Sequence, residues 1–256
     1  MMRETVTSRS NPLVSRLRKL NRDRSFRRAE GVFCGEGPKL LAEAVQWGAK
    51  LETVVCVSGL LLPPLPPETR VVEVPEALLE TVADTRTPQG ILFTCRGPTL
   101  SLPLQLEPGS WIILDGLQDP GNVGTVWRTA DALGGAGLIL CNGCADPWSP
   151  KTIRATMGAV FRLPVYEGTP AEAAQAVRRL GMKLYAAALL DHTLDIREIE
   201  WEGSAVVIGS EGHGVSREML DLCDGTMKIP MRSRCESLNA AAAASVALWE
   251  MAGRRL

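Results

Sequence analysis

Short apolar segments alternate with helix-like segments along the second half of the chain, and this alternation restricts the fold more than any other feature. Strands are expected at residues 111–115, 137–141, 163–166, 183–187, 205–208 and 225–229. Helices are expected between and after them, at residues 123–133, 149–157, 171–180, 216–222 and 237–252. Strands that are separated by helices pair in parallel and are covered on both faces. The pattern therefore predicts an α/β fold with a mainly parallel, doubly wound sheet.

A smaller α/β pattern precedes it. Residues 10–30 are predicted to form one basic helix, because Leu13, Leu17 and Leu20 fall at helical spacing after Ser10-Asn11-Pro12. Strands are expected at 32–34, 51–57, 71–74 and 91–95, with helices at 39–47 and 75–82. Turn signals at residues 98–109 indicate a linker. We therefore expect a small α/β domain at residues 1–97, a linker at 98–109 and a second domain at 110–256.

Positive charge is concentrated at the amino terminus of a nearly neutral chain. Residues 1–30 contain nine cations and three acids, whereas the net charge of all 256 residues is −1. Such an excess favours contact with a polyanion, with a solvated helix face or an Arg-rich transit peptide as alternatives. The seven cysteines have no regular spacing, and no apolar run reaches the roughly 18 residues that suggest a membrane span. We expect a cytoplasmic protein without a membrane segment.

Two loops that lie close together in sequence are the strongest indication of a ligand site. The first is Ile208-Gly-Ser-Glu-Gly-His-Gly-Val215, and the second spans residues 227–239 and leads into a helix whose first turn is expected to carry Ser237 and Asn239. Ligands of open parallel sheets bind beyond the carboxyl ends of the strands, where these loops begin. A third segment, residues 115–128, places Asn122 where it can cap a helix that carries Arg128.

Several common kinds of site are disfavoured by spacing. None of the glycine clusters fits the dinucleotide fingerprint or the phosphate-binding loop, and Gly209-Ser210-Glu211 is not a nucleophile elbow. The sequence has two histidines, His192 and His213, and Cys141-Asn-Gly-Cys144 has no second pair that would complete a zinc site. We therefore expect no metal.

Three segments together resemble the three motifs of SpoU/TrmH-type RNA 2′-O-ribose methyltransferases of the SPOUT class. They are Asn122 with Arg128, Gly209-Ser-Glu-Gly-His-Gly214, and Ile229-Pro-Met with Ser237-Leu-Asn239. Phe33-Cys-Gly-Glu-Gly-Pro-Lys39 and Thr85-Arg-Thr-Pro-Gln-Gly-Ile91 resemble the family's substrate-binding domain, which is similar to a ribosomal-protein fold. The resemblance implies a deep trefoil knot in the second domain, S-adenosylmethionine as cofactor, RNA as partner, and a homodimer with the site completed across its interface.

The resemblance also assigns residues of the site. The methyl donor is expected against Gly209, Ile229 and Leu238, with Ser210, Met231 and Leu189 beside them. Catalytic or RNA-contacting roles are expected for Asn122, Arg128, Glu211, Ser237 and Asn239. An arginine pKa above about 12 is a poor match for a general base at neutral pH. Arg128 is therefore expected to position a phosphate or hydroxyl group, and the identity of the base stays open.

Cations of the first domain are expected to bind RNA by neutralising phosphates: Arg9, Arg16, Arg18, Lys19, Arg27, Arg28 and Lys39. The appended first domain favours 23S-type ribosomal RNA as the substrate; transfer RNA, or a non-catalytic role in binding RNA or the ribosome, is the alternative. Ala240 and Thr156 stand where the family commonly has valine and often serine, and we expect these departures to affect only fine packing.

Overall fold

The computed structural model describes residues 3–234 and 237–253, which form two compact units. The first unit comprises Met1–Pro98 with Trp148–Phe161, and the second comprises Thr99–Pro147 with Arg162–Leu256. Residues 148–161 thus pack with the first unit although they follow two strands of the second, because α6 (Pro150–Thr156) contacts β2 (Val32–Glu36). Among the described residues, no helix is both long and apolar enough to cross a membrane.

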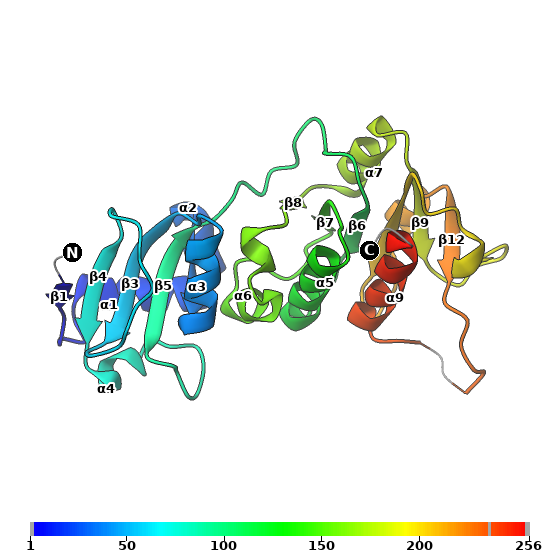
Figure 1. Ribbon diagram of the computed structural model, residues 1–256. Coiled ribbons are helices and arrows are strands. Elements are labelled where there is room, and N and C mark those ends of the chain that lie inside the picture. Colours follow the sequence, from blue (N-terminus) through cyan, green and yellow to red (C-terminus); the bar gives the residue numbers. More distant parts are fainter. Residues whose placement is uncertain (1–2, 235–236, 254–256) are drawn as a thin grey trace. The chain divides into compact units, whose positions relative to one another are not determined.

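The first unit is built on a mixed sheet with the strand order β1-β4-β3-β5-β2. Figure 1 labels β1, β4, β3 and β5 in this order. Its other strands are β1 (Arg3–Thr5), β3 (Leu51–Val57), β4 (Arg70–Val74) and β5 (Ile91–Arg96). Strand β5 runs antiparallel to β2 and β3, whereas β4 runs parallel to β1 and β3. The short strand β1 was not expected from the sequence.

Five further short elements accompany this sheet: α1 (Pro12–Arg22), α2 (Arg24–Glu30), α3 (Pro38–Gln46), α4 (Glu76–Leu79) and the 3₁₀ turn Ala159–Phe161, as far as the described residues extend. The expected single helix at 10–30 is wrong. It is broken at Asp23, whose backbone is extended (φ −116°, ψ 110°) and whose carboxylate accepts the amide of Phe26. Leu13, Leu17 and Leu20 are buried in the core as their spacing predicted.

The second unit contains a parallel sheet with the strand order β10-β12-β9-β11-β6-β7-β8. Its strands are β6 (Trp111–Asp115), β7 (Gly137–Cys141), β8 (Val165–Glu167), β9 (Lys183–Ala187), β10 (Leu194–Asp195), β11 (Ser204–Gly209) and β12 (Gly225–Lys228). All of its described pairings are parallel. The predicted mainly parallel α/β sheet is therefore confirmed, with the two-residue β10 as an unforeseen edge strand.

Successive residues of a strand point to opposite faces of the sheet. Both faces of this sheet carry buried apolar residues, and helices cover them. Trp111 and Ile113 of β6 pack in one core cluster with α7 (Pro170–Arg179) and with Met219 of α8 (Arg217–Leu220). The alternate residue Ile112 is equally buried. Helices α5 (Pro120–Ala132) and α9 (Ala240–Ala252) contact each other, and they also contact β7 and β11 respectively.

The beginnings of α5 and α9 differ from the expected ones. Asp119, not Asn122, caps α5, because its carboxylate accepts the amide of Asn122 at 2.9 Å. Asn122 therefore lies in the first turn, with its side chain available for other contacts. Helix α9 begins at Ala240 and is capped by Asn239, so Ser237 and Leu238 precede the helix rather than belong to it. Both corrections place site residues on loops or at helix ends.

Candidate functional site

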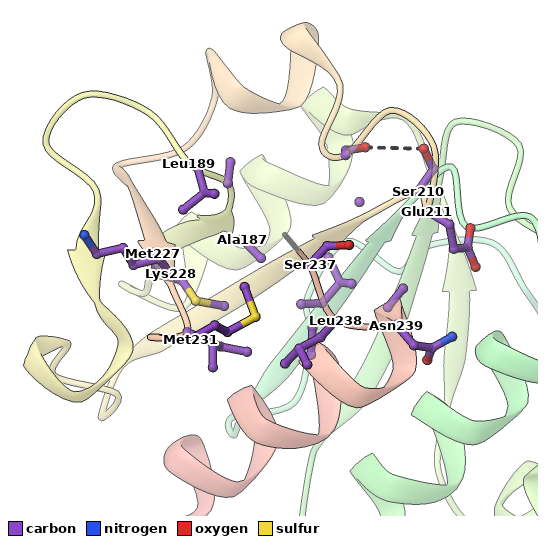
Figure 2. Close-up of a pocket in the computed structure, with 17 residues that line it drawn as sticks. Ala187, Leu189, Ser210, Glu211, Met227, Lys228, Met231, Ser237, Leu238 and Asn239 are labelled. Carbon is purple, nitrogen blue, oxygen red and sulfur yellow. Dashed lines mark hydrogen bonds between the residues drawn. The ribbon is translucent and has the colours of Figure 1, made fainter. Parts of the chain in front are cut away.

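A cavity of about 590 Å³ opens at the carboxyl ends of β9, β11 and β12 (Figure 2). This is the edge of a parallel sheet at which ligands bind, and the volume suits a small organic molecule. Its walls come from the ends of these three strands, the loops after them and the first turn of α9. The lining residues are Ala187, Ala188, Leu189, Ile208, Gly209, Ser210, Glu211, Gly214, Met227, Lys228, Ile229, Met231, Ser237, Leu238, Asn239, Ala240 and Ala243.

One side of the cavity is apolar and unusually exposed. Leu189 is 69% exposed, Met231 37% and Leu238 40%, and Figure 2 shows all three around the same space. A ligand that covers this exposed apolar surface removes it from water, which favours binding. The cavity brings together all six residues that the sequence associated with the methyl donor.

The loop after β11 folds back on itself to form the opposite side. Ser210 and Gly214 exchange two backbone hydrogen bonds, of 3.0 and 2.9 Å. A Cβ on Gly209 would overlap the backbone of Gly214 and Val215. The structure therefore gives a second reason for glycine at position 209, namely the approach of its own loop, besides the expected approach of a ligand. Gly214 has a φ of +67°, a conformation that favours glycine.

A buried carboxylate anchors this loop. Asp115, at the end of β6, is 2% exposed; it accepts the amide of Ser216 and the side-chain Nδ2 of Asn142, each at 2.6 Å. Asn142 also donates to the hydroxyl of Ser216 at 3.1 Å. Sequence analysis assigned no role to these three residues. An acid at the end of a buried apolar strand was the available signal, but its partners Asn142 and Ser216 are 27 and 101 positions away.

Three of the residues expected to be catalytic form a hydrogen-bonded chain at the edge of the cavity. Asn122 Nδ2 donates to Glu211 Oε1 at 2.6 Å, and Asn239 Nδ2 donates to Asn122 Oδ1 at 3.3 Å. The carbonyl oxygen of the Asn239 side chain accepts the amides of Ala241 and Ala242. Asn239 thus links the beginning of α9 to α5. Ser237 lines the cavity beside this chain.

Arg128 lies elsewhere. It is exposed on α5, does not line the cavity, and forms no hydrogen bond or ion pair within the part of the chain that the structure describes. The neighbouring helix α9 exposes two large apolar side chains, Trp249 (61%) and Val246 (36%). The fifth residue of the expected catalytic set is therefore separated from the other four within one chain.

Most of the cations expected to bind RNA make contacts within the first unit. Arg27 is buried at 4% exposure and donates to the carbonyl of Leu20 at 2.6 Å, so its placement does not suit an RNA contact. Arg16 lies between Glu30 and Glu52, with an ion-pair distance of 3.0 Å to each. Burial acts to lower the pKa of Arg16, but the hydrogen bonds and charges of Glu52 and Glu30 outweigh it and raise that pKa.

The remaining cations of this set are half-buried (Arg18, Arg28) or exposed (Arg9, Lys19, Lys39). The ring of Trp148 lies 5.3 Å from Arg28, and that of Phe26 lies 5.5 Å from Lys19. Arg18 donates to the hydroxyl of Thr81 at 3.0 Å. Arg9 and Lys39 are exposed. Most of these cations therefore make contacts within the first unit, and only some of them are exposed to solvent.

The Cys141–Cys144 pair is built into the core of the second unit. Cys144 Sγ donates to the carbonyls of Leu114 and Cys141 and accepts the amide of Leu117, each at 3.2 Å. Burial raises the pKa of Cys144 to about 11 and raises that of Cys141 further. Neutral, hydrogen-bonded thiols hold the turn after β7. Within the described residues, no group of three or more potential metal ligands comes together.

Comparison with known proteins gives matches to both units. Residues 110–249 match the SpoU rRNA Methylase family, and residues 11–92 match the MRM3-like substrate binding domain. The chain is 30% identical to the 23S rRNA (guanosine(2553)-2′-O)-methyltransferase RlmP of Bacillus subtilis over 97% of this chain and 99% of that protein.

Solved structures are similar over nearly the whole chain. The AdoMet-bound rRNA methyltransferase from Sinorhizobium meliloti has a TM-score of 0.86 and 31% identity, covering 99% of this chain and 98% of that one. The SpoU methyltransferase AviRb from Streptomyces viridochromogenes, in complex with the cofactor AdoMet, has a TM-score of 0.83 and 27% identity, covering 96% and 98%.

Proposed function

Because the chain belongs to the SpoU family of RNA methyltransferases, we propose that it transfers a methyl group from S-adenosylmethionine to a ribose 2′-hydroxyl of 23S-type ribosomal RNA. One observation carries the assignment of the site. The cavity at the ends of β9, β11 and β12 joins every residue expected to contact the donor to a polar chain of three expected catalytic residues. In this proposal, the domain at residues 1–97 binds the RNA and the domain at residues 110–256 catalyses methyl transfer. Residues 98–109 link the two domains.

The cavity suits the donor. Its exposed leucine and methionine side chains offer an apolar surface for a purine ring, and the strand ends supply backbone groups for the ring's polar edge. Gly209 keeps the backbone of β11 accessible, and Ser210 and Ser237 add hydroxyl groups. When bound, the donor supplies a methyl group already activated on a sulfonium centre. The protein must hold the acceptor oxygen in line with that group and allow its proton to leave.

The chain Glu211–Asn122–Asn239 holds the acceptor side of the site in place. The side-chain amide of Asn122 bonds to both Glu211 and Asn239, so it bridges the loop after β11 and the beginning of α9. Glu211 accepts a short hydrogen bond at 2.6 Å from Asn122, which favours an orienting role for its carboxylate. Removal of this bridge misplaces the acceptor, and a misplacement of about 1 Å lowers the rate about a hundredfold.

A second copy of the chain completes the site. Arg128 is exposed on α5 and does not line the cavity of its own chain, and α5 contacts α9, the helix that exposes Trp249 and Val246. Packing of this α5–α9 face against a second copy covers the apolar residues and brings each Arg128 to the other cavity, where it positions a phosphate or hydroxyl group. Replacement of Trp249 with glutamate is expected to yield monomers in sedimentation; dimers of unchanged stability would contradict the assigned face.

Mixing two inactive variants tests the position of Arg128. Arg128→Ala keeps the cavity, whereas Leu238→Arg fills it and keeps Arg128. If Arg128 acts across the interface, mixed dimers contain one complete site, and activity returns on mixing. If it acts within its own chain, the mixture stays inactive, and the proposed exchange is wrong. Separate calorimetry should show that Arg128→Ala binds S-adenosylmethionine as tightly as the wild type.

RNA binding by the first unit is supported around the beginning of α3. No side chain within the described residues caps this helix at Gly37, and Lys39 is exposed in its first turn. Free amides and a cation at a helix amino terminus suit phosphate. Glu36 accepts hydrogen bonds from the backbone and hydroxyl of Thr85, which holds the loop 84–90 beside it. Lys39→Gln is expected to weaken RNA binding without changing donor affinity.

The knot and the cytoplasmic location belong to the same proposal. Strand β12 lies beside β9, whereas α9 contacts α5 and β11, and this arrangement supports the knot that the family resemblance implies. The cysteines at positions 34, 95, 141, 144 and 223 carry thiols, which suits a reducing compartment.

Methylation mapping tests the function itself. Ribose methylation of 23S ribosomal RNA and transfer RNA is compared between cells with and without this protein. Loss of one ribosomal 2′-O-methyl group is the expected result, and loss of a transfer-RNA methyl group would redirect the substrate. Failure of the purified chain to bind S-adenosylmethionine would favour the non-catalytic RNA-binding alternative.

A further inference from the structure

Three cations lie at or near the rim of the cavity and have been given no role in donor binding. Lys228 lines the cavity at the end of β12, and Arg232 and Arg234 follow in the segment that leads from Met231 to Ser237. Both arginines are exposed and form no hydrogen bond or ion pair with the described residues. Figure 1 shows the described part of the segment after β12 extending away from the end of that strand.

Arg232 and Arg234 must lie near the cavity because the segment that connects them to its lining residues is short. Met231 and Ser237 both line the cavity, so Arg232 is one residue from a lining position and Arg234 is three residues from one. An extended chain covers at most about 3.6 Å per residue, which keeps each Cα within roughly 11 Å of the cavity wall. Both arginines are therefore confined to the neighbourhood of the cavity mouth.

Two acids near the cavity, Glu211 and Asp195, do not neutralise Arg232 and Arg234, because each already has another partner. Glu211, on the other side of the cavity, already accepts from Asn122 at 2.6 Å. Asp195, which pairs in register with Lys228, forms two hydrogen bonds with the guanidinium of Arg197. Glu236 follows in the sequence but lies outside the described residues. The donor does not account for the charge either, since S-adenosylmethionine itself carries a net positive charge.

The RNA acceptor carries negative charge that can pair with these arginines. A ribose 2′-oxygen is attached next to the 3′-oxygen that carries a phosphodiester, so this oxygen cannot reach the donor without bringing a phosphate to the cavity mouth. Arginine guanidinium groups suit phosphate oxygens through paired N–H donors. We infer that Arg232 and Arg234 bind the phosphodiesters that flank the methylated ribose; this inference rests on the proposed function.

The salt dependence of RNA binding tests the inference, because each phosphate contact releases counterions. For single-stranded RNA, the slope of log affinity against log salt concentration is about 0.7 per contact. With fluorescein-labelled oligouridylate and deproteinised bacterial 23S ribosomal RNA as probes, Arg232→Gln and Arg234→Gln are each expected to reduce the slope by about 0.7, and the double variant by about 1.4. Donor affinity in calorimetry is expected to stay within twofold of the wild type.

Lys183→Gln is the matched control. Lys183 is an exposed cation of the same unit, but it begins β9 and lies at the opposite end of that strand from the cavity. Its removal should leave the slope unchanged. An unchanged slope in the double arginine variant, or an equal decrease in the lysine control, overturns the inference. A parallel loss of donor affinity also overturns it, because the arginines would then shape the donor pocket.

Failure of the proposed function has a different signature. It appears in the wild type as absent donor binding and absent methyl transfer. The comparison of slopes among the variants still decides whether Arg232 and Arg234 contact phosphate.

Discussion

Replacing Gly209 with alanine perturbs the donor cavity through the backbone alone. A Cβ at this position would overlap the carbonyl group of Gly214 and the amide nitrogen of Val215. These are backbone atoms, so no side-chain rotation relieves the overlap, and the loop after β11 has to move away from the strand. We therefore expect both the stability of the second unit and donor binding to fall.

The magnitude follows from the hydrogen bonds that hold this loop. Displacement strains the two backbone bonds between Ser210 and Gly214, each with a net value of about 0.5–1.5 kcal/mol. It also strains the bond from Ser216 to the buried carboxylate of Asp115, and a bond to a charged group contributes about 1.5–3 kcal/mol. Partial loss of the three predicts a destabilisation of about 2–4 kcal/mol, which overlaps the upper part of the range of about 1–3 kcal/mol that is typical of overpacked interiors.

Gly212→Ala is the control within the same loop. A Cβ on Gly212 meets nothing within 4 Å among the described atoms, and its φ lies outside the left-handed range. Denaturant unfolding measures stability, and calorimetry with S-adenosylmethionine measures the cavity. Gly212→Ala should match the wild type in both assays, whereas Gly209→Ala should be destabilised and bind the donor at least tenfold more weakly, the equivalent of about 1.4 kcal/mol.

Two results would refute this reasoning. Wild-type stability and donor affinity in Gly209→Ala would show that the loop moves aside at no cost. Equal damage from Gly212→Ala would show that general loop flexibility, and not the close approach at Gly209, controls the site.

Three further predictions concern a buried anchor, a helix cap and buried thiols. Asp115→Asn replaces one of two accepting oxygens by a donor, so we expect a loss of about 1.5–3 kcal/mol in unfolding free energy together with weaker donor binding; full donor affinity would dismiss the anchor. Asn239→Asp should keep the cap of α9 but lose the donation to Asn122, lowering methyl transfer at near-wild-type stability, whereas Asn239→Ala should also lose about 1 kcal/mol of stability. Burial raises the pKa of Cys34 and Cys95 to about 12 from 9.0. Since the folded state favours the neutral thiol, its stabilising contribution is complete below about pH 9 and falls between about 9 and 12 by about 1.4 kcal/mol per thiol and pH unit. Cys34→Ala should make the alkaline decrease in unfolding free energy shallower by that amount, and an identical slope would contradict the burial argument.

The sequence was sufficient for features that depend on neighbouring residues. Apolar runs and their spacing located β6, β7, β9 and β12 to within about a residue at each end and predicted the parallel sheet. The two loops after β11 and β12 were expected to meet, because parallel strands end at the same sheet edge. The cavity there contains every residue assigned to the donor from the motifs.

The tertiary structure decided what depends on partners distant in sequence. Whether Asn122 caps its helix or binds Glu211 is set by Asp119, which takes the cap, and by a partner 89 positions away. Whether Arg27 meets RNA or the core is set by how α2 packs, since its charge is the same in both settings. Local pattern fixes where strands and helices form, because it acts through the nearest few residues. The direction of a polar side chain is fixed by which atoms the folded chain brings within hydrogen-bond distance.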